Sequence, residues 1–298
     1  MGILKVTVPA TSANLGPGFD CVGIALDLVN TLYFSTEKNK MQALPHGAVP
    51  LSAGSLAHQG FNLVAEKSGK KLSSDLSVAI GANVPRSRGL GSSATLTVAG
   101  IVAANVLLEA DLCEEEIITL ATRIEGHPDN AAPAYLGGLV VSVNTEEGIR
   151  YLKVEPPQTL RAVVAVPDFE LATAAARKVL PTQVARQDAV FNAGHFGLFM
   201  TAILTGQVQM LGLAMEDRLH QPYRTPLVPG LQEVMAAARA QGALGSCLSG
   251  AGPSVFAFCN RADEEIAEAM KNTWRRVGIK AEVFRLNISL EGTRYTFI

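Results

Sequence analysis

Charged and aromatic residues are scarce in this chain. Of its 298 residues only 17% are charged and 6% are aromatic, whereas 48% are hydrophobic. Globular proteins usually carry about 25% charged residues. A chain this apolar must bury a large core, which excludes disorder driven by charge repulsion. Its length predicts one large domain or two domains of about 150 residues each.

The chain also has no excess of basic residues. It contains 25 Lys and Arg against 27 Asp and Glu, which gives a formal net charge of −2. Nucleic acids and anionic membrane surfaces select proteins with clustered positive charge. We therefore predict neither a nucleic-acid nor a membrane partner.

Cysteine is rare and shows no metal-binding pattern. The four cysteines, at positions 21, 113, 247 and 259, form no CxxC pair, so they are expected to be buried, reduced thiols of a cytoplasmic protein. Residues 1–8 lack the charged and apolar regions of a secretory signal peptide. Both observations predict a cytoplasmic location.

One uncharged stretch, residues 89–108, is long enough to cross a bilayer. Its first seven residues read GLGSSAT, however, and form a polar turn. The apolar remainder, residues 96–108, has the length of a buried core helix. The stretch is therefore predicted to be a helix of the core.

The order of predicted elements is mixed, which is typical of an α+β fold rather than of strict β-α alternation. The predicted strands are residues 4–8, 22–29, 32–36, 76–80, 139–143, 160–166, 254–258 and 281–286. The predicted helices are residues 55–67, a long helix from Ser92, and residues 114–123, 173–179, 187–204, 231–241 and 263–277. The consecutive prolines Pro156 and Pro157 predict a boundary between domains at residues 1–156 and 157–298.

The most informative segment, residues 85–94 (PRSRGLGSSA), lies between a predicted strand and the long helix. Its glycines allow the backbone to approach a ligand, and the unpaired amides of the first helical turn favour phosphate. A serine at the helix start could also bind a metal ion. The alternative is that Ser92 or Ser93 only caps the helix and the glycines only turn the chain.

Two general nucleotide motifs fail here. The pattern Gly89-x-Gly91-x-x-Ala94 matches a relaxed dinucleotide fingerprint, but residues 81–88 separate it from its strand and Glu109 ends the helix itself. A Walker A loop needs a lysine, and none lies between Lys71 and Lys153. The loop is therefore expected to bind phosphate without the usual lysine.

Three segments together resemble the GHMP kinases, the family that includes galactokinase, mevalonate kinase and homoserine kinase. They are the loop at 85–94, PATSANLGPGFD at 9–20 and SGAGPS at 249–254. The segments EGHPDNAAP at 125–133 and PYR at 222–224 are similar to those of the homoserine kinases in particular. Order and spacing agree over the whole chain, and the three glycine loops are expected to meet at one cleft.

The resemblance implies a two-domain GHMP fold: an N-terminal domain like domain 2 of ribosomal protein S5 and a C-terminal ferredoxin-like domain, with the active site between them. The implied reaction is transfer of the γ-phosphoryl group of ATP to the side-chain hydroxyl of L-homoserine, giving O-phospho-L-homoserine for threonine synthesis. The oligomeric state is not revealed by the sequence, and a homodimer is one option.

The resemblance also assigns the nucleotide site. Ser93 and Glu125 match the family's Mg²⁺ ligands, with Ser92 as the alternative to Ser93, and Asn62 resembles a residue on the adenosine side. Glu125 could instead be an exposed helix end, and Asn62 a helix surface residue. The ATP loop would comprise Pro85, Arg86, Ser87, Arg88, Gly89, Leu90, Gly91, Ser92, Ser93 and Ala94.

The acceptor is a zwitterion with one hydroxyl. Arg177 and Arg224 match positions that bind its carboxylate, for which the guanidinium fork is suited. Asp20 would face its ammonium group. The remaining residues assigned to the acceptor are Asn14, His127, Asp129, Asn130 and Gly250. The alternatives are solvated surface charge for the two arginines, turn capping for Asn14 and Asp20, and a helix-start histidine satisfied by its loop for His127.

The catalytic base is the least defined part. Asn130 stands where some GHMP kinases carry an aspartate, and an amide cannot accept the hydroxyl proton. Asn130, Ser93 and Glu125 are therefore expected to act without a base, with direct proton transfer to a phosphate oxygen. The competing hypotheses are a GHMP kinase acting on a sugar or an isoprenoid alcohol, and a non-catalytic nucleotide sensor.

Overall fold

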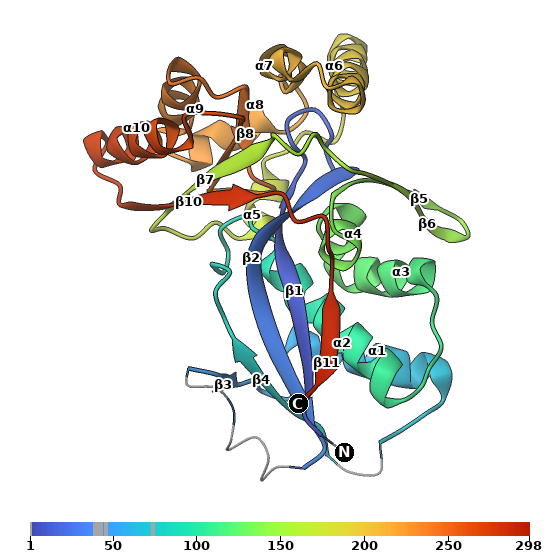
Figure 1. Cartoon of the computed structure of the whole chain (residues 1–298). Coiled ribbons are helices and arrows are strands. Elements are labelled where there is room, and N and C mark those ends of the chain that lie inside the picture. The colour runs from blue at the N-terminus through green and yellow to red at the C-terminus, as the bar shows by residue number, and fades with distance from the viewer. Residues whose placement is uncertain (1, 38–43, 45–46, 73–74) are drawn as a thin grey trace.

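The computed structural model describes residues 2–37, 44, 47–72 and 75–298, and folds them around two antiparallel sheets (Figure 1). Helices and sheets are mixed along the chain, which confirms the predicted α+β class. Every predicted strand and helix overlaps an observed element. The described elements that the sequence did not predict include the helix Pro128–Leu136, which contains Pro133, and the strand Gly148–Val154.

The first sheet has the order β11-β1-β2-β4-β3, and β5 and β6 extend it beside β2. Its strands are β1 Leu4–Ala13, β2 Val22–Ser35, β3 Val49–Pro50, β4 Ser77–Gly81, β5 Leu139–Thr145, β6 Gly148–Val154 and β11 Arg294–Phe297. Strand β11, close to the C-terminus, pairs with β1 near the N-terminus (Figure 1). The domain division after residue 156 remains a prediction, and β11 crosses it.

Strand β2 runs through a position that the sequence predicted to be a break. The predicted strands at 22–29 and 32–36 form one strand. The contacts of Asn30 explain why the strand continues through this position. Its buried side-chain amide donates to Thr95 Oγ1 (2.8 Å), while its Oδ1 accepts the amides of Asn83 and Val84, each at 2.9 Å. Asn30 thereby ties β2 to the segment that enters the glycine-rich loop.

Helices α1 to α4 pack around this sheet, with bounds Leu56–Ser68, Ser92–Leu107, Glu114–Glu125 and Pro128–Leu136. Helix α2 is buried over most of its length, as predicted for a core helix. It touches α1 closely, because a Cβ on Gly100 would overlap the carbonyl of Ala57. Among the described residues, no helix combines the length and apolar character that crossing a membrane requires.

The second sheet has the order β10-β7-β9-β8. Its strands are β7 Arg161–Pro167, β8 Gly245–Leu248, β9 Val255–Cys259 and β10 Ala281–Asn287. The remaining helices are α5 Thr173–Lys178, α6 Arg186–Thr205, α7 Leu211–Ala214, α8 Gln221–Arg224, α9 Leu231–Ala240 and α10 Asp263–Arg276, with 3₁₀ turns at Val208–Met210 and Thr225–Leu227. Leu26 and Leu139 of the first sheet share a core with Phe199 and Phe256 of the second region. This shared core fixes the two sheets relative to each other.

All four cysteines are free thiols, but the prediction that all are buried was wrong. Cys247 and Cys259 are buried in strands of the second sheet. Cys21 is half-buried, and Cys113 is exposed at the start of α3.

Candidate active site

A cavity of about 260 Å³ lies where the two halves of the chain meet. The glycine-rich loop and the start of α4 line it from one side, and α5, α8 and the loop after β8 line it from the other. The lining includes Asn14, Asp20, Ser87, Arg88, Gly89, Leu90, Gly91, Ser92, Ser93, Glu125, His127, Asp129, Asn130, Thr173, Arg177, Arg224 and Gly250. Most residues predicted for the nucleotide and acceptor sites therefore share one cavity, to which Thr173 is added.

The glycine-rich loop leads into α2 without a side-chain cap. Gly91, not Ser92 or Ser93, is the N-cap residue, so the capping alternative does not hold. Gly89 and Gly91 have φ values of 75° and 63°, which favour glycine. A Cβ on Gly91 would overlap Thr11 Oγ1, so the turn leaves no room for a side chain. The first-turn amides and the positive end of the helix dipole are available to an anion.

The three glycine loops meet, as predicted. Ser249 Oγ donates to the carbonyl of Gly89 (2.6 Å) and lies 2.8 Å from Ser12 Oγ. The amide of Gly250 donates to the carbonyl of Ala13 (3.1 Å). The loop after β8 thereby fastens the glycine-rich loop to the end of β1.

Part of the predicted ATP loop faces elsewhere. The guanidinium of Arg88 donates to the carbonyls of Pro167 (2.9 Å) and Asp168 (3.1 Å) and forms an ion pair with Glu170. Its side chain therefore anchors the loop to the second half of the chain. The cavity lining does not include Pro85, Arg86 or Ala94.

Helices α2 and α3 bring hydroxyl and carboxylate oxygens together beside the glycine-rich loop. Ser93 Oγ donates to Glu125 Oε1 (2.9 Å), and Thr97 Oγ1 donates to the same oxygen (2.6 Å). The hydroxyl of Ser92 is directed instead at the carbonyl of Val84, which favours Ser93 over Ser92. Thr97 was not among the residues predicted from the sequence, although a residue four positions after Ser93 lies on the same face of a helix.

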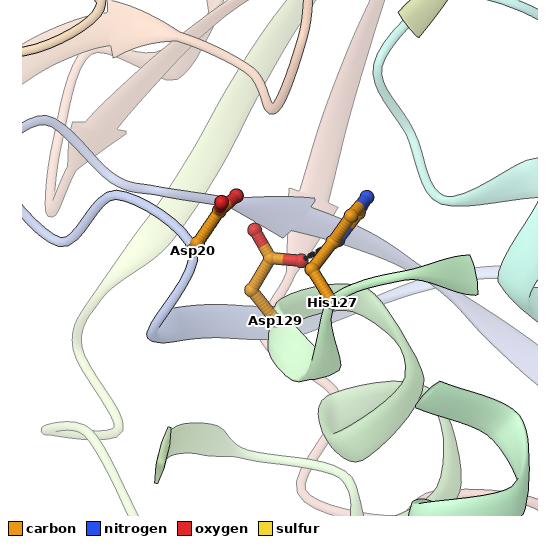
Figure 2. A group of neighbouring side chains, drawn as sticks. All are labelled: Asp20, His127 and Asp129. Atoms are coloured by element: carbon orange, nitrogen blue, oxygen red, sulfur yellow. Dashed lines mark hydrogen bonds and ion pairs between the residues drawn. The ribbon is translucent and has the colours of Figure 1, made fainter. Parts of the chain in front are cut away.

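Three ionisable side chains converge on the acceptor side of the cavity (Figure 2). Asp20 comes from the loop after β1, and His127 and Asp129 come from the start of α4. Asp129 is buried, and one of its oxygens is hydrogen-bonded to His127 Nδ1. Burial alone lowers the pKa of His127, but the hydrogen bond and the charge of Asp129 outweigh it, so the pKa is raised above 6.5.

Both asparagines are held in fixed orientations. Asn14 Nδ2 donates to the carbonyl of Gly250 (2.9 Å), and its Oδ1 accepts the amide of Asp20 (3.0 Å), so the turn-capping alternative holds for Asn14. Asn130 Oδ1 accepts the hydroxyl of Thr11 (2.8 Å), and its Nδ2 donates to Asp129 (3.3 Å). Asn130 therefore enters the cavity with a defined amide orientation.

The two predicted carboxylate ligands are arranged differently. Arg177 forms two hydrogen bonds with Asp20, at 2.7 and 2.9 Å, which raise its pKa. Arg224 is only 1% exposed and donates to the carbonyls of Ala176 and Gly250. Burial lowers the pKa of Arg224 to about 10. Arg224 is therefore not a solvated surface charge.

Asn62 lies apart from this cavity. It lines a second cavity of about 470 Å³ beside α1, together with Phe61, Lys70 and Lys71. The structure therefore does not bring Asn62 together with the glycine-rich loop in one cavity.

Comparison with known proteins identifies the family. Residues 55–138 match the GHMP kinases N terminal domain, and residues 199–278 match the GHMP kinases C terminal domain. A homoserine kinase of Microchaete diplosiphon is 42% identical over 97% of this chain and 96% of the relative, and one of Gloeobacter violaceus is 47% identical over 90% and 92%. The crystal structure of homoserine kinase from Cytophaga hutchinsonii matches with a TM-score of 0.87 and 30% identity, covering 99% of this chain and 98% of that one. The predicted two-domain fold is thereby confirmed, and the chain belongs to the GHMP kinase family, among its homoserine kinases.

Proposed function

We propose that the protein transfers the γ-phosphoryl group of ATP to the side-chain hydroxyl of L-homoserine. The observation that carries this proposal is the charge arrangement in one cavity. Arg177 and Arg224 lie beside the carboxylates of Asp20 and Asp129, next to the uncapped N-terminus of α2. A small zwitterion complements the two arginines and two aspartates, and a phosphate complements the N-terminus of α2.

The nucleotide side would use the backbone of residues 87–93. Its amides and the dipole of α2 supply positive potential in place of the missing lysine. The hydrogen bond from Ser249 to Gly89, and that from the Val84 amide to Asn30 just before the loop, support a preorganised site. Preorganised donors favour phosphoryl transfer because they need not reorient as charge moves between the phosphate oxygens.

The donors beside this loop fit a Mg²⁺ ion. Ser93 Oγ and Glu125 Oε1 are both oxygens, the ligand type that Mg²⁺ prefers, and two protein ligands leave positions for waters and phosphate. When bound, Mg²⁺ would neutralise charge on the phosphate oxygens. Thr97 would keep Glu125 in place through its hydrogen bond to Oε1.

The acceptor side would bind homoserine through its charged head. The carboxylate would lie between Arg224 and Arg177, and the ammonium would face Asp20 and Asp129. Arg177 and Asp20 form an ion pair with each other, so homoserine would exchange one ion pair for two. This arrangement holds the hydroxyl toward Asn130 and the phosphate loop.

Transfer would then proceed without a base. Asn130, oriented by Thr11 and Asp129, can donate its amide N–H to the acceptor oxygen but cannot take its proton. The homoserine oxygen forms a bond to the γ-phosphorus as the bond to the β,γ-bridging oxygen breaks. The hydroxyl proton passes to a γ-phosphate oxygen, and ADP leaves.

The test is ADP release by the purified protein with Mg-ATP and a panel of acceptors: L-homoserine, L-threonine, mevalonate, galactose and 3-amino-1-propanol. Homoserine should give the highest kcat/KM, and phosphorus NMR should detect O-phosphohomoserine. The aminopropanol should react poorly because it lacks the carboxylate that the arginines would bind. Absence of homoserine-dependent ADP release, or equal rates with mevalonate or galactose, would overturn the proposal.

A further inference from the structure

His220 lies behind the acceptor cavity and is fully buried. Its ring stacks on Phe19, with ring centroids 5.2 Å apart, and the guanidinium of Arg224 lies 5.2 Å from the same Phe19 ring. Arg224 Nη1 is 3.2 Å from His220 Nδ1, and His220 Nε2 is 2.8 Å from the carbonyl oxygen of Gly16. His220 therefore bridges the N-terminal loop that carries Asp20 and the helix that carries Arg224.

The two neighbours determine which nitrogen of His220 carries the proton. A guanidinium can only donate hydrogen bonds, so Nδ1 must accept from Arg224 with its lone pair. A backbone carbonyl can only accept, so Nε2 must donate to Gly16. Both contacts are satisfied only by the neutral ring protonated on Nε2.

A buried carboxylate holds the backbone around His220. Asp217, with a side chain that is 0% exposed, accepts the amides of Leu219 (2.9 Å), His220 (3.1 Å) and Gln221 (2.7 Å). It also accepts the side-chain amide of Asn192 (2.8 Å). The backbone of the loop before α8 is therefore fixed, which limits the positions that the His220 side chain can take relative to Arg224.

On the other side, Gly16 is equally confined. Its φ is 88°, and a Cβ there would overlap the carbonyl of Met215. The Gly16 carbonyl is therefore a fixed acceptor for His220. Four residues later the same loop presents Asp20 to the cavity.

We propose that His220 is a positioning residue that orients the Arg224 guanidinium for the substrate carboxylate, an inference that rests on the function proposed above. The guanidinium is held on three sides, by His220, by Gly250 O and by Ala176 O. None of the described residues forms a hydrogen bond with Arg224 Nη2, so this nitrogen is available to an anionic ligand. Through Gly16 the same imidazole also fixes the distance between Arg224 and the loop of Asp20, and thus between the two ends of a bound zwitterion.

The charged groups that act on His220 come from three segments. Asp217 lies 3.5 Å from Nε2, Arg224 lies on the Nδ1 side, and Asp20 acts from the N-terminal loop. The carbonyl oxygen of Gly16 and the ring of Phe19 also contact His220. Arg224 would repel a protonated ring, while Asp217 and Asp20 would attract it.

The test compares His220→Phe and His220→Gln with the wild-type enzyme. Phenylalanine keeps the stack on Phe19 but offers no acceptor to Arg224, whereas glutamine offers one acceptor and one donor. His220→Phe should raise the KM for homoserine about tenfold, the effect of losing one hydrogen bond to a charged group, with little change in the KM for ATP. His220→Gln should recover most of the affinity.

A matched control is His195→Phe, because His195 also stacks on a phenylalanine, Phe191, but lies outside the cavity lining. It should leave the KM for homoserine unchanged. An unchanged KM in His220→Phe, or a glutamine variant as weak as the phenylalanine variant, would overturn the proposal.

A second readout needs no substrate. Nitrogen NMR of the wild-type protein labelled on histidine should find the neutral ring of His220 with the proton on Nε2, assigned by the signal lost in His220→Gln. A proton on Nδ1 would overturn the proposal even if the Phe variant failed to fold. If wild-type enzyme did not phosphorylate homoserine, the proposed function would fail while this measurement still tested the contact with Arg224.

Discussion

The guanidinium of Arg177 and the carboxylate of Asp20 form two parallel hydrogen bonds, of 2.9 and 2.7 Å, across 157 residues of sequence. Their side chains are 36% and 34% exposed, and both line the acceptor cavity. Exposed ion pairs contribute about 0 to 1 kcal/mol to folding. The pair is therefore better explained as a preorganised half of a zwitterion site than as a device for stability.

This arrangement predicts that Arg177→Gln raises the KM for homoserine by about tenfold or more, the usual effect of losing a charge-assisted bond. The melting temperature should change little, because the pair is partly exposed. Steady-state kinetics and thermal unfolding measure the two effects. Asp20→Asn should weaken homoserine binding as well. In the double variant the two effects on KM should be less than additive because both partners are then uncharged. A large loss of stability with unchanged KM would contradict this reading.

Thr97→Val should raise the Mg²⁺ concentration that the activity requires. Thr97 Oγ1 donates one of two hydrogen bonds to Glu125 Oε1, and valine keeps the shape of the side chain without the donor. The Mg²⁺ concentration for half-maximal activity should rise about tenfold, while calorimetric binding of ATP in the presence of a chelator should not change. Thr97→Ser keeps the hydroxyl and is the control. Equal Mg²⁺ requirements in Thr97→Val and Thr97→Ser would argue against the role of Thr97.

Gly91→Ala should abolish most of the activity. A Cβ at this position would overlap Thr11 Oγ1 and come within 3.0 Å of Asn130 Oδ1, and the φ of 63° is strained for alanine. Both the glycine-rich loop and the orientation of Asn130 would be disturbed, so we expect kcat/KM to fall about a hundredfold or more. The control is Gly194→Ala on the exposed face of α6, where a Cβ would meet nothing within 4 Å and alanine should stabilise the helix. Near-normal kcat/KM in Gly91→Ala would mean that the loop does not approach the phosphate closely.

The site was predictable where a local motif carries it. The loop at 85–94 could be interpreted because its glycines allow a close approach to a ligand, and the resemblance of the segments at 9–20 and 249–254 favoured this explanation over a simple turn. Arg224 could be named by resemblance, but its burial could not be predicted, since it depends on carbonyls of Ala176 and Gly250 that lie far away in sequence. No local pattern revealed that Arg177 and Asp20 pair with each other.

In the fold, too, features with a local sequence pattern were predicted, and features that depend on distant contacts were not. Long helices such as α2 and α6 were predicted, but the strand β11 was not, because an exposed four-residue strand has too little pattern. The single strand β2 was split in the prediction at Asn30, a residue that usually ends strands. Its side chain makes three hydrogen bonds to residues 83, 84 and 95, and such tertiary partners override the local preference.

His220 should also make stability depend on pH. Burial lowers its pKa below the ordinary 6.5, although Asp217 opposes this effect, and Arg224 adds to the lowering. The unfolded chain therefore binds the proton more readily than the folded one, so acid favours unfolding. The free energy of unfolding of wild-type protein minus that of His220→Phe should be constant above pH 6.5 and should fall as the pH drops below it, by about 1.4 kcal/mol for each unit by which the folded pKa is lowered. Urea unfolding of both proteins over this range measures the difference. The remaining histidines and carboxylates are common to both proteins, so their contributions to the difference in unfolding free energy largely cancel. If this difference grew on acidification, the ring of His220 would already be protonated in the folded state. A protonated ring could not accept a hydrogen bond from Arg224.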